Sequence, residues 1–227
     1  EKSSETLSRA FHLPELVLRA VEQLPGSAPR LLHEGRIIRP WHVEVLVKAR
    51  KRRQELRIGL IDNGTYVHVM DEFKRHNFML DWLDLSLDGP EAIHSVQRGS
   101  EAAYRDAMVG FRHAREVTKP RNHGGRVTSL FTLTILNHES FEDTARILFP
   151  MDADPLVDQL HMTTMSPTRA ELEPLELRDF HEFWVQAKRV FIRYGHDSER
   201  KQRIFFRFYR HHELLKLGTM VGAKQMN

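Results

Sequence analysis

The chain has 227 residues, of which 41% are hydrophobic, so it can bury the core of one large domain or two small ones. No run approaches the roughly 20 apolar residues of a membrane span, and the amino terminus lacks the apolar segment of a secretory signal. Because no cysteine is present, disulfides and thiolate metal sites are excluded within these residues. We therefore expect a globular, cytoplasmic protein without a membrane partner.

The charges nearly balance, with 34 lysines and arginines against 31 acidic residues and a net charge of +3. Basic residues cluster at residues 48–53 (KARKRR) and 200–210 (RKQRIFFRFYR), and the second cluster is interleaved with aromatic residues. Such a pattern can bind nucleic acid, with cations on phosphates and rings on bases. The balancing acidic residues favour the alternative of solvated helix faces, so no nucleic-acid partner is expected. The spacing of the 14 histidines predicts no metal site.

Helix and strand patterns alternate from the start of the chain. Residues 13–24 are predicted to form a helix, because apolar residues recur at helical spacing, Pro14 suits a first turn and Pro25-Gly26 would end the pattern. The following predicted elements are, in order, a short strand within residues 28–40, a helix over 41–53, a strand over 57–62, a helix over 67–76 and a strand over 82–87.

The alternation continues through the middle of the chain. Residues 100–117 have the pattern of a helix, and residues 127–136 (VTSLFTLTIL) are the most strand-like segment, rich in β-branched and aromatic residues. A short helix over residues 141–149 and a further strand within residues 157–165 follow. About five strands joined by helices predict an α/β fold with parallel strands and right-handed crossovers.

The last third of the chain has a different character. Residues 175–193 and 204–217 are two amphipathic helix candidates, and the aromatic stripe on the first is typical of core packing. We therefore divide the chain into residues 1–167, an α/β domain, and residues 168–227, a helical carboxyl-terminal portion.

Three spaced blocks carry a resemblance to a known family: IGLIDNGT at residues 58–65, WLDLSLDG at residues 82–89 and QRGSEAAY at residues 97–104. The first two are apolar runs ending in Asn-Gly or Gly, as where a buried parallel strand meets a loop. This series resembles the core of radical S-adenosylmethionine (SAM) enzymes, which carry a strand ending in "TNGT", one ending in "SLDG", and then an arginine-glycine turn. The similarity is greatest to peptide-modifying members of the SPASM/twitch type.

The resemblance implies a partial (β/α)6 barrel, similar to a TIM barrel, that holds SAM and a [4Fe-4S] cluster. In the family, the cluster cleaves SAM to a 5′-deoxyadenosyl radical. It also implies a ribosomally made peptide or protein as substrate and a reductant such as flavodoxin or ferredoxin. The barrel would position the target carbon beside the radical.

The resemblance also implies cofactor-binding residues at the carboxyl ends of the strands, where ligands bind in parallel α/β folds. The "GGE" loop that holds the SAM ammonium corresponds to Glu34 and Gly35, with the carboxylate displaced by one position. Asn63 corresponds to the "TNG" asparagine, although an ordinary Asn-Gly turn also explains it.

Ser86 and Asp88 match the "SLDG" block, where the serine contacts the SAM ribose or carboxylate and the aspartate shapes the turn. Arg98 could hold a carboxylate bidentately, or form a salt bridge at a helix entrance. Thr132 would contribute from the next strand. His161 would lie near adenine or substrate, although a core or surface histidine is the favoured interpretation.

The family's cysteine motif, CxxxCxxC, and the strand before it have no counterpart in this sequence. A degenerate relative should lose the cysteines but keep the strand, because its loss would leave a sheet edge bare. This favours a sequence that omits part of an active enzyme. The alternative is a non-catalytic binding module with a radical-SAM-like fold and no iron–sulfur cluster.

Overall fold

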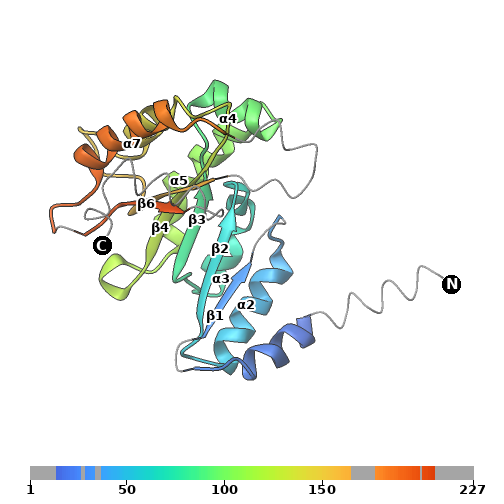
Figure 1. Ribbon diagram of the computed structural model, residues 1–227. Helices are drawn as coiled ribbons and strands as arrows, with labels where there is room; N and C mark the ends of the chain where they lie inside the picture. The colour runs from blue at the N-terminus through green and yellow to red at the C-terminus, as the bar shows by residue number, and fades with distance from the viewer. Residues whose placement is uncertain (1–13, 27–28, 34–36, 165–176, 200, 208–227) are drawn as a thin grey trace.

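A six-stranded parallel sheet organises the protein (Figure 1). The computed structural model describes residues 14–26, 29–33, 37–164, 177–199 and 201–207. The strands are β1 (Arg30–His33), β2 (Arg57–Asp62), β3 (Trp82–Ser86), β4 (Arg126–Leu133), β5 (Gln159–Thr164) and β6 (Ile204–Arg207). They lie in the order β1-β2-β3-β4-β5-β6, and every neighbouring pair is parallel. The predicted α/β fold with parallel strands is confirmed, and the sheet is consistent with a partial barrel.

Helices fill the connections between the strands. A first helix covers residues 14–22. The others in the described residues are α2 (Pro40–Arg52), α3 (Met70–Arg75), α4 (Glu91–Arg98), α5 (Ala103–Val117), α6 (Phe141–Leu148) and α7 (His181–Tyr194), with short 3₁₀ turns η1 (Thr65–Val69) and η2 (Arg121–His123).

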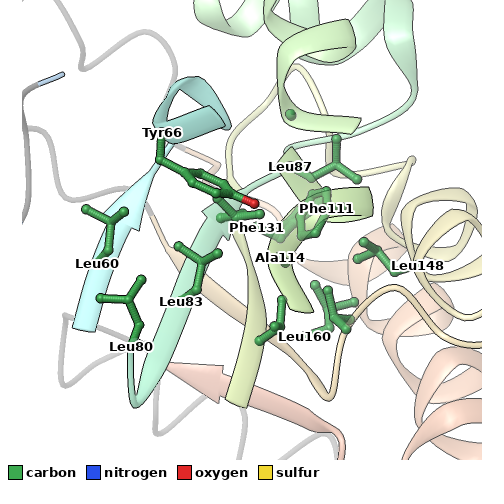
Figure 2. Packing of buried hydrophobic residues seen from close by; sticks show 14 of the residues in the cluster. Leu60, Tyr66, Leu80, Leu83, Leu87, Phe111, Ala114, Phe131, Leu148 and Leu160 are labelled. Carbon is green, nitrogen blue, oxygen red and sulfur yellow. The ribbon is translucent and has the colours of Figure 1, made fainter. Parts of the chain in front are cut away.

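One face of the sheet carries the hydrophobic core. Because each crossover moves to the next strand in the same direction and is right-handed, the crossover helices collect on one face. Leu60, Leu83 and Leu160 from three different strands are fully buried there, in one cluster with Phe111 and Ala114 of α5 (Figure 2).

The other face of the sheet, called here the far face, is more polar. Strand register places on it Leu32, Gly59, Ile61, Trp82, Asp84, Ser86, Arg126, Thr128, Leu130, Thr132, Gln159, His161, Thr163 and Phe205. Most of these side chains are only partly buried, whereas their neighbours on the core face are buried. The strands therefore alternate in polarity, unlike strands covered by helices on both faces.

The carboxyl-terminal part differs from the prediction. Residues 204–207 form strand β6, which pairs with β5 through Ile204 and Leu160, instead of starting a helix. The apolar run is too short for its periodicity to distinguish a helix from a strand. Pairing with β5, which fully buries Ile204, makes it a strand. The rest of the predicted helix, residues 208–217, lies outside the described residues, as does the junction at residues 167–168.

Helix α4 is a second difference, because no helix was predicted between the strand at residues 82–87 and the helix that starts at residue 100. It ends at Gly99, whose left-handed backbone (φ 64°) suits a helix carboxyl terminus, and α5 begins four residues later. Across the parts of the chain that the structure describes, no helix combines the length and the hydrophobicity needed to cross a membrane.

Two carboxylates, one buried and one partly buried, join strands at the amino end of the sheet. Asp81 accepts the N–H of Ile58 at the start of β2 (2.7 Å) and is paired with Arg50 (2.5 Å) and Lys119 (2.8 Å). Burial alone would raise the pKa of Asp81, but the hydrogen bonds and nearby cations outweigh it and bring the pKa below its ordinary value of 3.8.

Asp158 repeats this arrangement between β4 and β5. It accepts the N–H of Val127 (2.8 Å) and pairs with Arg115 (2.7 Å) and with Arg121. Burial again opposes these interactions, and the pKa of Asp158 is again lowered overall. The β2–β3 and β4–β5 junctions thus each have a carboxylate whose donors come from the neighbouring strand and from cationic side chains.

We predict that Asp81→Asn lowers the free energy of unfolding by about 3 kcal/mol at pH 7, because two cations lose their buried counter-ion. Since the folded pKa lies below the unfolded one, the stabilisation by Asp81 is complete above about pH 4 and is lost as the pH falls through the lowered pKa. The variant should therefore lose less stability than wild type between pH 5 and pH 2 in urea titrations.

The control for this prediction is Glu199→Gln, which removes an exposed pair with Lys201. It should change the free energy of unfolding by no more than about 1 kcal/mol. Equal effects of the two substitutions would show that Asp81 is not a structural anchor.

Candidate functional site

The turn after β2 is closed by its own side chains. Asp62 Oδ1 accepts the N–H of Tyr66 (2.9 Å), and the Thr65 hydroxyl donates to the same carboxylate. The Tyr66 hydroxyl donates to the Gly110 carbonyl in α5 (2.6 Å), and burial raises the pKa of Tyr66. Asn63 remains exposed at the tip of this turn.

Close packing against α5 explains why position 64 of this turn is a glycine. Its φ is 91°, and a Cβ atom added there would lie 2.2 Å from the Asp106 carbonyl oxygen. A Cβ atom on Gly110 of α5 would in turn lie 2.6 Å from the Gly64 Cα. Close approach of the turn to α5 therefore accounts for the glycine without any ligand.

Asp88, two residues beyond β3, is the centre of the polar network at the carboxyl end of the sheet. Its side chain is fully buried. Oδ1 accepts the backbone N–H of Thr132 near the end of β4 (2.8 Å), and Oδ2 accepts the Nε–H of Arg98 on α4 (2.6 Å). Both carboxylate oxygens are thus satisfied by protein donors, so Asp88 holds β3, β4 and α4 together.

His94 completes the same turn as a neutral imidazole. Burial lowers the pKa of His94 and outweighs the opposite effect of the nearby Asp88 charge. The Nδ1 atom accepts the backbone N–H of Asp88 (3.0 Å). Nδ1 also lies 3.7 Å from Asp88 Oδ2, but a nitrogen that accepts a hydrogen bond carries no proton for an ion pair.

Three polar residues of this network were missed by the sequence analysis. Asn137 donates to the carbonyls of Asp88 (2.8 Å) and Thr132 (2.9 Å). Gln97 also donates to the Thr132 carbonyl (3.0 Å), and Thr134 donates to Gln97 (2.9 Å). Nothing in the local pattern distinguishes these residues from ordinary helix-surface and turn residues.

Arg98 is the member of the network that can still bind a ligand. Its side chain is 28% exposed, and neither Nη atom donates to any residue that the structure describes. Arg98 is the last residue of α4, so its salt bridge lies at the end of this helix and not at the predicted helix entrance. The salt bridge and a ligand site are compatible, because Asp88 uses only Nε. A guanidinium oriented in this way presents two Nη donors to a carboxylate.

The other predicted site residues lie around this network at different depths. Ser86 ends β3 on the far face and is 7% exposed. Thr132 takes part through its backbone, as described above. His161 lies farther down β5, where it is 4% exposed, packs on Phe205 with ring centroids 4.7 Å apart and contacts Gln159 (3.0 Å). Its surroundings are those of a packed core histidine.

Glu34 and Gly35 lie outside the described residues. The next described element is helix α2, which begins at Pro40. In its first turn His42 Nδ1 accepts the N–H of Arg39, the residue before the helix (2.8 Å). Burial and the nearby His33 and Arg39 lower the pKa of His42 to about 4, so it is a neutral acceptor at this helix start. Among the described residues no group of three or more histidines or carboxylates could hold a metal ion.

Comparisons with known proteins give limited information. No family model matches the chain, and no curated protein matches it. Among solved structures, it is similar to a domain of a pyruvate-formate lyase-activating enzyme from Bacteroides vulgatus ATCC 8482. The TM-score is 0.49 and the identity 13%, over 80% of this chain and 99% of that one. At these values the likeness decides neither activity nor ligand.

We predict that Gly64→Ala destabilises the protein by more than about 2 kcal/mol, because it combines left-handed strain with collision against α5. Gly124→Ala is the matched control, since Gly124 also has positive φ (78°) but nothing within 4 Å of an added Cβ atom. That control should cost only about 1 kcal/mol. Urea unfolding measures both, and equal losses would contradict the close-packing explanation.

Proposed function

We propose that this chain is a radical-SAM-type protein that binds SAM at the carboxyl end of its sheet and acts on a ribosomally made peptide or protein. The observation that supports this best is the Asp88–Arg98 pair, a buried carboxylate that orients a guanidinium whose Nη atoms have no described partner. The motif blocks at residues 58–65, 82–89 and 97–104 support the choice of SAM as ligand.

In this proposal Arg98 receives the carboxylate of the methionine part of SAM. Ser86, the last residue of β3, supplies a hydroxyl. Asn63, at the tip of the turn after β2, supplies an amide. Glu34 and Gly35 would offer acceptors to the SAM ammonium.

The iron–sulfur cluster of the family does not fit the residues present. Three cysteines would be needed, and the sequence has none. The residues present are therefore proposed to bind SAM alone. Radical chemistry would need cysteine ligands from outside these 227 residues, together with a reductant such as flavodoxin or ferredoxin.

We predict that wild-type protein binds SAM saturably in isothermal titration calorimetry and that Arg98→Gln raises the Kd more than tenfold. The reason is the loss of a charge-assisted, bidentate contact to the SAM carboxylate. Arg98→Lys should be intermediate, because it retains the charge but not the paired donors.

Arg105→Gln is the control for the SAM experiment, since its 74% exposed side chain lies outside the network and should leave the Kd unchanged. Circular dichroism spectra would verify that each variant is folded. Failure of wild-type protein to bind SAM would refute the proposed function.

The second candidate function, a binding module without a cluster, is favoured by the absence of cysteine from the sequence. Iron analysis separates it from an enzyme. If the polypeptide made in the native organism acts by radical chemistry, anaerobic reconstitution should give about four iron atoms per chain. SAM binding without iron would instead identify the binding module.

A further inference from the structure

Arg126, the first residue of β4, has a guanidinium with no partner among the described residues. Its side chain is partly buried, and its Nε atom is fully buried without a hydrogen bond. No described residue forms a hydrogen bond or ion pair with this guanidinium. An unpaired, partly buried cation is costly, so an external anion would stabilise it.

Trp82 lies beside Arg126 on the far face, because the two residues are paired in the register of β3 and β4. Its indole ring covers Gly59 of β2, where an added Cβ atom would lie 1.9 Å from a ring carbon. Trp82 is only partly buried, although its strand, β3, has a neighbour on each side in the sheet. Trp82 thus forms an apolar platform next to the cation.

Two more arginines lie at this end of the same face. Arg57 is two residues before Gly59 on β2, and Arg30 is paired with Arg57 in the register of β1. Neither side chain has a hydrogen bond or ion pair with a described residue. In contrast, Arg50 and Arg115 at the same end of the sheet are paired with Asp81 and Asp158.

We infer that the surface formed by Arg30, Arg57, Trp82 and Arg126 binds an acidic segment of a peptide. Carboxylates of the segment would pair with Arg126 and Arg57, and an apolar side chain between them would cover the Trp82 ring. The site lies at the amino end of the strands, whereas Arg98 lies at their carboxyl end. The inference therefore goes beyond the proposed SAM site and does not depend on it.

Charge on the far face favours a peptide over a nucleic acid. Asp84 lies two residues beyond Trp82 on the same face, so a continuous polyphosphate backbone would approach a carboxylate. Trp82 is also a single ring, whereas single-stranded nucleic acids are usually held by several stacked rings. In a peptide that alternates acidic and apolar residues the negative charges are spaced, so an apolar residue rather than a carboxylate can lie beside Asp84.

The test is calorimetric titration with a blocked hexapeptide of alternating glutamate and leucine, at low salt and at several salt concentrations. We expect saturable, salt-sensitive binding, and no binding of the same peptide with glutamine in place of glutamate. Arg126→Gln should weaken binding by about tenfold, the value of one charge-assisted contact, and Arg126→Lys should weaken it less.

Arg112→Gln, a change to an exposed α5 residue, is the control and should leave binding unchanged. Circular dichroism of each variant shows whether it is folded. A SAM titration of each variant shows whether the SAM site still binds, so that loss of peptide binding alone can be assigned to this surface. Equal affinity for both peptides, an unchanged Arg126→Gln variant, or tighter binding of a single-stranded RNA oligonucleotide would each overturn the inference.

Discussion

The burial of the Asp88 carboxylate constrains the whole carboxyl end of the sheet. A charge with no access to water is tolerated only where fixed donors replace its hydration, and these donors come from β4 and α4. The distance between β3, β4 and α4 is consequently set by hydrogen-bond geometry. The same hydrogen bonds fix the position of the Arg98 side chain, which is bonded to Asp88.

The two ends of the sheet use carboxylates differently. Asp81 and Asp158 at the amino end are each paired with two cations, which leaves those side chains little capacity for ligands. Asp88 pairs with the Nε of one arginine and leaves both Nη atoms without a described partner. The group available to a ligand at the carboxyl end is therefore a positioned cation, which suits a carboxylate.

Strand and helix alternation was predictable, because buried parallel strands and amphipathic helices have distinct periods in sequence. One exception, β6, is a short apolar run whose state depends on pairing with β5, because Ile204 pairs with Leu160, which lies 44 residues earlier in the chain. The network around Asp88 was only partly predictable for a similar reason. Asp88 and Arg98 lie in two nearby motif blocks, whereas Asn137 donates to Asp88 across 49 residues of sequence, and the composition of its turn does not indicate that contact.

The composition of the far face is itself an argument about function. If helices covered both faces, strand residues would be apolar throughout, but Arg126 and Thr132 of β4 and Gln159 and Thr163 of β5 are polar and only partly buried. Partly buried arginines with no counter-ion in the described part of the chain, and a partly exposed indole, are costly on a face that contacts only water. Both features are explained when the far face receives a ligand along its length, with SAM at the end set by Asp88 and an acidic peptide at the end set by Arg126.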